Sequence, residues 1–529
     1  MSQLELIIAL LVAVAVIVRL ANELRLPPAI LLLIGGIALS FVPTLGKVEL
    51  APEIIFTLFL PPLFFVAGVR TSWRDFRQSI RPIGMLALGL VILTTLVVGW
   101  VAHWAIPNLP WAAAFALGAI VSPTDAVAAT SITKSLGVPR RIVTILEGES
   151  LVNDATGLVV YRVAVAAALT GAFSIWNASG KFLLIGGGGV VVGLGFGWAV
   201  KFFFKRIDDA PVENTIALVL PFAAYILADE ILGVSGVVAV VATGFMLSRS
   251  ALNNNSSETR LQGQAFWDML EFLFNNALFL LVGLQLRHIV TDLGAISVGQ
   301  AVGYAALVSI TLIVTRFVWS FVATYLPKLW NRQPAADDPF PSWRSVFVVA
   351  WTGMRGAISL AAALGLPIIL TSGAPFPQRN LIIFITFFSI LATLVVQGLT
   401  LPTIIRALKL EDDGETAREE AEARLELTRA ALSRIEEIEA DENETPQLLE
   451  ALRRRYQHQA EALESLVGKD SDACRDYFRD DRQLQLDILN AERAKLSELR
   501  KHGALHEDAA RRIGHDLDLE EQRLQSHDW

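Results

Sequence analysis

The chain has 529 residues, of which 53% are hydrophobic and 18% charged, and its formal net charge is −8. The charge is uneven: residues 1–410 contain 26 Lys and Arg against 20 Asp and Glu, whereas residues 411–529 contain 18 against 32. This composition predicts an apolar body embedded in a membrane, followed by a charged acidic tail. The single cysteine, Cys474, excludes a disulfide framework or a thiolate metal cluster within one chain.

Thirteen apolar runs in the body approach or exceed the length of about 20 residues that a helix needs to cross a bilayer. They lie near 4–20, 28–45, 53–69, 82–105, 110–132, 142–168, 180–203, 212–229, 231–248, 266–287, 296–326, 343–371 and 380–408. No basic residue precedes the first run, and Arg19 and Arg25 follow it, which is the wrong polarity for a cleavable signal peptide. We therefore expect an all-α membrane protein with about 13 transmembrane helices, the first of them retained.

Basic residues are concentrated in alternate loops. The loops after spans 1, 3, 5, 7, 9 and 11 carry 17 Lys and Arg, including those at span ends, and the opposite loops carry 4. Because short cytoplasmic loops are enriched in Lys and Arg, this imbalance places the N-terminus outside. We expect a multi-pass protein of the cell inner membrane whose C-terminal tail is cytoplasmic.

Spans 5 and 12 both contain a break near their middle. Span 5 contains Ser122-Pro123-Thr124-Asp125, and proline disfavours helical geometry at the preceding residue and frees carbonyls one turn back. Span 12 contains Gly353-Met354-Arg355-Gly356, where two glycines flank an arginine and ease unwinding. Paired interruptions in two halves of a chain indicate a midplane site between inverted repeats. The halves would be spans 4–6 and 11–13.

Span 6 contains an unusually polar stretch from Glu147 to Gly157. At helical spacing Ser150 and Asp154 lie on one face, and Glu149 and Asn153 form the adjacent stripe. A carboxylate at the centre of a membrane helix costs about 2.5–3.5 kcal/mol on insertion scales, so it must meet partners, protons, water or ions. Arg355 in span 12 needs a buried anion, and span 6 supplies one.

Other polar features of the body are less specific. The Pro61-Pro62 pair in span 3 predicts a kinked helix. Arg162 in span 6 and Arg316 in span 11 either reach a membrane interface or pair internally, and Asp268 and Glu271 in span 10 lie near the cytoplasmic end, where they cap or snorkel.

The motifs Ser122–Asp125, Glu149–Asp154 and Gly353–Ala357 together resemble those of the monovalent cation:proton antiporter-1 family, the sodium/proton exchangers of bacteria, archaea and animals. The resemblance covers about residues 1–410. It implies a homodimer whose protomer has a dimerisation part and a moving six-helix core, with two unwound helices that cross.

The resemblance also implies the members of an ion site. Asp154 is then the carboxylate that takes either cation or proton, and Asp125, Ser150 and the backbone carbonyl of Thr124 complete the shell for Na+. Oxygen ligands of this kind suit a hard cation, and one carboxylate can hold Na+ or H+ alternately.

Three further positions follow from the resemblance. Glu149 and Arg355 would form a structural ion pair, and Asn153 is the amide where electrogenic relatives have a second aspartate. Several relatives carry an acidic residue where this chain has Val66, so span 3 is not expected to supply an ion ligand.

The sequence thus predicts an antiporter that exchanges Na+, with Li+ as a further substrate, for H+ by alternating access. We expect an electroneutral one-for-one exchange, with roles in pH and sodium homeostasis. A K+/H+ antiporter of the same fold is an alternative, and a cation channel is a more distant one. The body contains only His103 and His288 and no metal-ligand spacing, so we expect neither an enzyme nor a cofactor, and no nucleic-acid partner.

The tail after Leu408 is predicted to form helices near 415–439, 446–467, 472–501 and 505–525. A solvated bundle that assists dimerisation would explain it. Five of the seven histidines lie in it, so pH sensing is an alternative role, because histidine titrates near neutrality. These are His458, His502, His506, His515 and His527.

Overall fold

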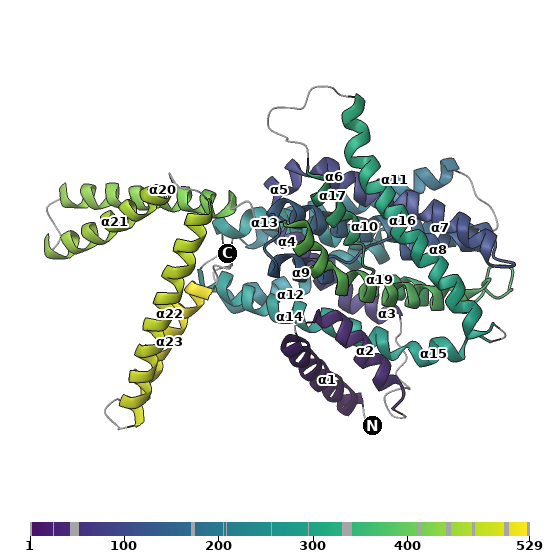
Figure 1. Cartoon of the computed structure of the whole chain (residues 1–529), viewed down its shortest axis with the longest axis horizontal. Helices are drawn as coiled ribbons and strands as arrows, with labels where there is room; N and C mark the ends of the chain where they lie inside the picture. The colour runs from purple at the N-terminus through teal and green to yellow at the C-terminus, as the bar shows by residue number, and fades with distance from the viewer. Residues whose placement is uncertain are drawn as a thin grey trace. The chain divides into compact units, whose positions relative to one another are not determined.

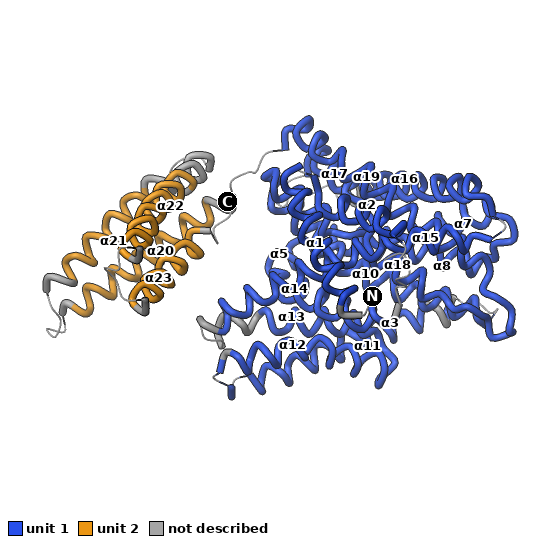
Figure 2. Tube along the Cα trace, turned by 90° about the horizontal axis from the view of Figure 1, so that it is seen from below, with its two compact units in different colours: residues 1–410 blue, residues 411–529 orange. Residues whose placement is uncertain are grey.

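A computed structural model of the chain describes residues 3–24, 26–42, 52–170, 175–204, 206–207, 209–254, 257–294, 296–330, 341–410, 415–440, 446–467, 471–501 and 507–525. Over these residues the secondary structure is helical, apart from one isolated bridge between Ile369 and Pro375. The chain forms two compact units, Met1–Leu410 and Glu411–Trp529, coloured separately in Figure 2. The prediction of an all-α protein is confirmed.

The first unit is a bundle of long helices with several short ones at its ends (Figure 1). Its helices, including three π-helical stretches η1 to η3, are α1 (Gln3–Leu24), α2 (Pro28–Ser40), α3 (Pro52–Ile54), η1 (Ile55–Phe59), α4 (Leu60–Arg70), α5 (Trp73–Gln78), α6 (Ile80–Gly84), η2 (Met85–Leu90), α7 (Val91–Ala105), α8 (Trp111–Val121), α9 (Ala126–Ser135), α10 (Arg140–Thr170), α11 (Ile175–Phe204), α12 (Ala210–Ile226), η3 (Leu227–Ile231), α13 (Gly236–Asn254), α14 (Ser257–Leu284), α15 (Leu286–Thr291), α16 (Val298–Trp330), α17 (Trp343–Trp351), α18 (Ala357–Leu364) and α19 (Arg379–Leu408).

Nine helical segments of the described chain are long and apolar enough to cross a membrane, and three shorter apolar helices accompany them. Burial separates the central segments from the peripheral ones. The segments Trp111–Ser135 and Arg379–Leu408 are each 72% buried over their most apolar stretch, whereas Glu5–Leu24 is 17% buried. The centre of the body is therefore built from α8, α9 and α19. The number of crossings, about 13, stays a prediction.

A π-helical turn precedes the proline pair of span 3. Pro61 and Pro62 begin α4, and the preceding turn is the π-helical stretch η1. Proline has no N–H to donate to the carbonyl one turn back, so the wider π-helical turn falls directly before the pair.

The second unit contains four helices, α20 (Glu415–Ala440), α21 (Pro446–Val467), α22 (Ser471–Lys501) and α23 (Glu507–Gln525). Ala421 and Leu425 of α20 pack with Leu463 of α21, and Arg429 forms a salt bridge of 2.9 Å with Glu464. His502, His506 and His527, which the pH-sensing alternative includes, lie outside the described residues, as do Arg25, Lys47, Lys205 and Arg332 of the basic-residue count.

Candidate cation-binding site

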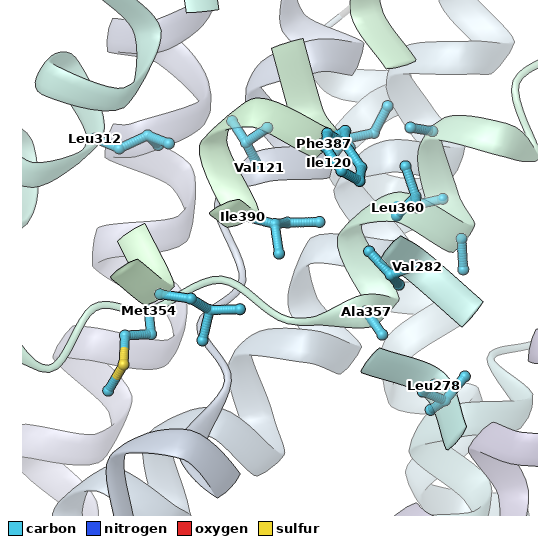
Figure 3. Packing of buried hydrophobic residues seen from close by; sticks show 14 of the residues in the cluster. Ile120, Val121, Leu278, Val282, Leu312, Met354, Ala357, Leu360, Phe387 and Ile390 are labelled. Carbon is cyan, nitrogen blue, oxygen red and sulfur yellow. The ribbon is translucent and has the colours of Figure 1, made fainter. Parts of the chain in front are cut away.

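Two broken helices meet at the centre of the body. One break separates α8, which ends at Val121, from α9, and the other separates α17 from α18. The backbone N–H of Asp125 in the first break donates to the carbonyl of Met354 in the second, at 2.8 Å. Figure 3 shows the extended backbone between Met354 and Ala357, with Val121 and Ile120 of α8 nearby. The two breaks therefore satisfy part of each other's backbone hydrogen bonding, as non-helical backbone at membrane depth requires.

Both glycines of span 12 stand at positions with no room for a larger residue. A Cβ at Gly356 would lie 2.6 Å from Oδ2 of Asp125, and a Cβ at Gly353 would lie 2.8 Å from Nε of Arg316. Real Cβ atoms do not come this close to other heavy atoms. The glycines thus allow a carboxylate and a guanidinium to approach the backbone of the break.

Backbone donors hold the start of α9 in place. Asp125 caps this helix, and its Oδ1 accepts a hydrogen bond of 2.8 Å from the N–H of Val127. The hydroxyl oxygen of Ser150 on α10 accepts a hydrogen bond of 3.2 Å from the N–H of Ala126. Two of the N–H groups that a helix start leaves unpaired are satisfied in this way, one of them by a residue of span 6.

Three of the predicted ion ligands line one cavity of about 340 Å3. These are Asp154 and Ser150 on α10 and Asp125 at the start of α9. Asp154 is 7% exposed, so its carboxylate is almost entirely removed from solvent. The same cavity is bordered by four charged residues, Arg70, Lys134, Glu147 and Glu271. We call it the ion cavity, and it contains the carboxylates of Asp154 and Asp125 together with these four charged residues, which we call its rim.

Thr124 and Asn153, which the sequence also predicts in the ion site, are not among the residues that line the ion cavity. They are 4% and 1% exposed. The Asn153 amide donates to the Thr124 hydroxyl at 2.7 Å, and that hydroxyl donates to Oε1 of Glu149 at 3.1 Å. Their side chains therefore link α10 to the break in span 5.

The predicted ion pair between Glu149 and Arg355 is wrong for this structure. Both carboxylate oxygens of Glu149 accept from the guanidinium of Arg316 on α16, one through Nη1 and the other through Nη2 at 2.9 Å. Arg316 also donates to the carbonyl of Val349 at 2.9 Å. Both charged side chains are 1% exposed, so this is a fully buried bidentate pair.

Arg355 is also fully buried, but its contacts are with backbone and hydroxyl groups. Its Nη1 donates to the carbonyl of Gly353 at 3.1 Å, and its backbone N–H donates to Oγ1 of Thr393 at 3.1 Å. Its Nε has no hydrogen-bond partner in the part of the chain that the structure describes. The resemblance assigned Arg355 to Glu149, but α16 brings Arg316 to this carboxylate instead.

The rim of the ion cavity carries ion pairs that sequence reasoning did not assemble. Arg70 at the end of α4 pairs with Asp268 and, at 2.6 Å, with Glu271 on α14. Lys134 on α9 pairs with Glu147 on α10 at 2.9 Å. The basic residues at the ends of spans 3 and 5, which the sequence uses for orientation, could have indicated partners for the nearby acids.

Arg162, for which the sequence allows either a membrane interface or an internal partner, also pairs internally. Arg162 on α10 contacts the carboxylate of Asp229 in η3. The side chain of Asp229 also accepts from the N–H of Gly236 at 3.4 Å. This pair connects span 6 to the end of span 8.

Comparisons with known proteins identify the family of the chain. The family model described as "Sodium/hydrogen exchanger, transmembrane" matches residues 7–407. An uncharacterised Na+/H+ exchanger of Mycobacterium tuberculosis is 36% identical over 98% of this chain and 95% of its own length. A sodium, potassium, lithium and rubidium/H+ antiporter of Bacillus subtilis is 33% identical over 91% of this chain and 72% of its own length.

A solved structure shares the fold. The structure of the sodium proton antiporter MjNhaP1 from Methanocaldococcus jannaschii has a TM-score of 0.63 and 21% identity, and the match covers 78% of this chain and 99% of that one. Together with the match of the family model over the whole body, the sequence relatives decide the assignment. The chain belongs to the sodium/hydrogen exchanger family of membrane transporters.

Proposed function

We propose that this protein exchanges Na+ for H+ across the cell inner membrane, one cation for one proton. The observation that carries the proposal is the meeting of two broken helices, through Asp125 and Met354, beside a cavity that contains Asp154, Asp125 and Ser150. Carboxylate and hydroxyl oxygens suit a hard alkali cation, and a carboxylate also takes a proton. Cation and proton then compete for Asp154.

The charges around the site support a stoichiometry of one. Five ionisable side chains gather near the breaks: the guanidiniums of Arg316 and Arg355 and the carboxylates of Glu149, Asp125 and Asp154. Glu149 pairs with Arg316, and Oδ1 of Asp125 accepts a hydrogen bond from the N–H of Val127. Counted as formal charges, the two guanidiniums and three carboxylates leave the site with a single negative charge, which one Na+ or one H+ neutralises. The loaded site then has the same charge in both directions of transport.

A second candidate is exchange of K+ for H+. Two Bacillus relatives, 34% and 33% identical, are named as sodium, potassium, lithium and rubidium/H+ antiporters. The same oxygen ligands can hold Na+, Li+ or K+, because the choice among alkali cations depends on cavity size, ligand number and flexibility rather than on ligand type. Exchange with each cation in turn separates these candidates.

We further propose transport by alternating access in a homodimer, with roles in pH and sodium homeostasis. The moving core would consist of spans 4–6 and 11–13, which contain both breaks. The rim residues of the ion cavity, Arg70, Lys134 and Glu147, adjoin the loops that the basic-residue count assigns to the cytoplasm. With the N-terminus outside and the tail inside, the cavity faces the cytoplasm.

Proteoliposomes test the stoichiometry directly. A pH gradient drives uptake of Na+, and the membrane potential is clamped by valinomycin with chosen K+ gradients. Rates that do not change with the clamped potential are expected. Rates that rise with potential would mean that a second proton moves with each cation, and would place Asp125 among the groups that titrate during transport.

A further inference from the structure

A second cavity, of about 550 Å3, contains none of the predicted ion ligands. It is bounded by α4, α11, α12, α13 and α14, and we call it the amphipathic cavity. Helix α4 separates it from the ion cavity: Phe64 and Ala67 line the ion cavity, whereas Phe65 and Val66 line the amphipathic cavity. Arg70 borders both. The volume of the amphipathic cavity falls in the range of about 300–1,000 Å3 that small-molecule sites occupy.

Two charged groups in the amphipathic cavity have no ion-pair partner in the described chain. Glu213, in the first turn of α12, is 4% exposed, and its Oε2 has no hydrogen-bond partner. Lys201, near the end of α11, lines the same cavity and forms no salt bridge with it, so the ammonium and the carboxylate are more than 4.0 Å apart. Leaving a buried carboxylate without a partner is costly, so a ligand that donates to Glu213 would be stabilising.

The other residues that line the amphipathic cavity are mainly apolar, and polar side chains lie at one edge of it. Phe65, Leu220 and Trp267 line it, and the Trp267 ring lies 5.4 Å from that of Phe65. The exposed side chains of Arg260 and Gln264 stand at the edge. A ligand that fits has an ammonium for Glu213, an anion for Lys201 and a hydrocarbon part for the aromatic wall.

We propose that the amphipathic cavity binds a phospholipid with a zwitterionic headgroup and a primary amine. Its ammonium would donate to Glu213, its phosphate would accept from Lys201, and its acyl chains would lie along the apolar wall. The surrounding helix ends, at Arg70, Lys201 and Glu213, flank loops that the sequence assigns to the cytoplasm, which places the headgroup at the inner leaflet. A choline headgroup lacks N–H donors and cannot replace the ammonium.

The test is lipid competition on the full-length protein, followed by native mass spectrometry. The protein is equilibrated with equal amounts of dioleoyl phosphatidylethanolamine, phosphatidylcholine and phosphatidylglycerol, and the retained lipids are counted by mass. The variants are Glu213→Gln and Lys201→Gln. The matched controls are Glu230→Gln and Lys181→Gln, which remove exposed charges at the opposite ends of the same spans.

The wild-type protein and both controls should retain the ethanolamine lipid about tenfold over the choline lipid, because a charge-assisted hydrogen bond is lost with choline. Glu213→Gln should abolish this preference, and Lys201→Gln should lower retention of all three lipids. Equal retention of ethanolamine and choline lipids by the wild type, or a preference that survives Glu213→Gln, would overturn the proposal.

Two further binding measurements test the proposal without relying on the Glu213 variant. If Glu213→Gln fails to fold, the wild type is titrated with the mono- and dimethylated ethanolamine lipids, whose retention should fall as N–H donors are removed; a flat series would contradict the proposal. Displacement of bound lipid by an equal concentration of glycerophosphoethanolamine would overturn the assignment to a lipid. These binding measurements need no transport, so they stand or fall separately from the exchange proposed above.

Discussion

Glu149 is held by a guanidinium that arrives from a helix 167 residues further along the chain. Both groups are fully buried, so each would carry a large desolvation penalty without the other. The Thr124 hydroxyl donates a further hydrogen bond to the same carboxylate and accepts one from the Asn153 amide. The ion pair therefore joins α10 to α16, and Thr124 joins α10 to the break in span 5.

Removing Arg316 should destabilise the protein more than removing Arg355. We expect Arg316→Ala to lower the free energy of unfolding by about 3–5 kcal/mol, because Glu149 is left buried without its partner. Thermal melting of purified protein, followed by fluorescence-detected size exclusion, measures the difference. The double variant Glu149→Met with Arg316→Met should recover most of the loss. A lower melting temperature for Arg355→Ala than for Arg316→Ala would contradict the observed pairing.

Asp154 should be indispensable for exchange. Asp154→Asn keeps the size of the side chain but removes the charge that holds either Na+ or H+, so we expect no cation-dependent pH response in everted vesicles. Asp292→Asn, at an exposed position outside the cavity, is the matched control. Exchange at the wild-type rate by well-folded Asp154→Asn protein would remove Asp154 from the mechanism.

The family resemblance was enough to predict that Asp154, Asp125 and Ser150 share a site, and two observations agreed with it: Ser150 and Asp154 lie one turn apart on a helix, and Asp125 adjoins a proline break. Residue types and spacing were not enough to choose between Arg316 and Arg355 for Glu149. That choice depends on where α16 packs and on Gly353, whose missing side chain makes room for Arg316.

At the scale of elements, the break in span 12 depends on glycine for space as well as for flexibility. Gly356 is in extended backbone, with φ −113° and ψ −176°, which any residue can adopt. The requirement at this position is therefore the close approach of Asp125, not an unusual backbone conformation.

Gly356→Ala should consequently slow exchange without unfolding the protein. The added methyl group would displace the Asp125 carboxylate, and a misplacement of about 1 Å in a functional group costs up to roughly a hundredfold in rate. Initial rates in proteoliposomes measure the effect. Gly195→Ala, on α11, where an added Cβ has nothing within 4 Å, is the control. Equal rates for both variants would show that Asp125 tolerates displacement.

The breaks themselves were predictable, since Pro123 and the paired glycines act within one turn of the chain. The π-helical stretch before Pro61 was not, because proline indicates only that a hydrogen bond is missing and not how the neighbouring turn adjusts. The amphipathic cavity could not be predicted from the sequence either, because residues of five helices line it. Val66, where relatives carry an acid, lines that cavity and is not among the residues lining the ion cavity.

At the scale of the whole molecule, the acidic tail forms a compact unit that begins at Glu411. The residues of the ion cavity all lie in the other unit. The tail is therefore expected to modify exchange rather than to perform it.

A protein truncated after Leu410 should still exchange cations for protons. We expect its pH profile to shift or its dimer to weaken, while its maximal rate stays within about twofold of the full-length value. Light scattering with size exclusion measures the oligomer, and vesicle assays at a series of pH values measure the profile. Loss of exchange in a truncated protein that melts normally would assign the tail an essential role.

The long separation between Glu149 and Arg316 has a consequence for how the protein is made. At about 5–20 residues per second, the ribosome needs roughly 8–33 s to reach Arg316 after it has added Glu149. During this interval span 6 enters the bilayer with a carboxylate whose permanent partner does not yet exist. The carboxylate and the guanidinium that neutralise each other in the finished protein thus enter the membrane separately, and we expect the insertion machinery to shelter Glu149 until span 11 arrives.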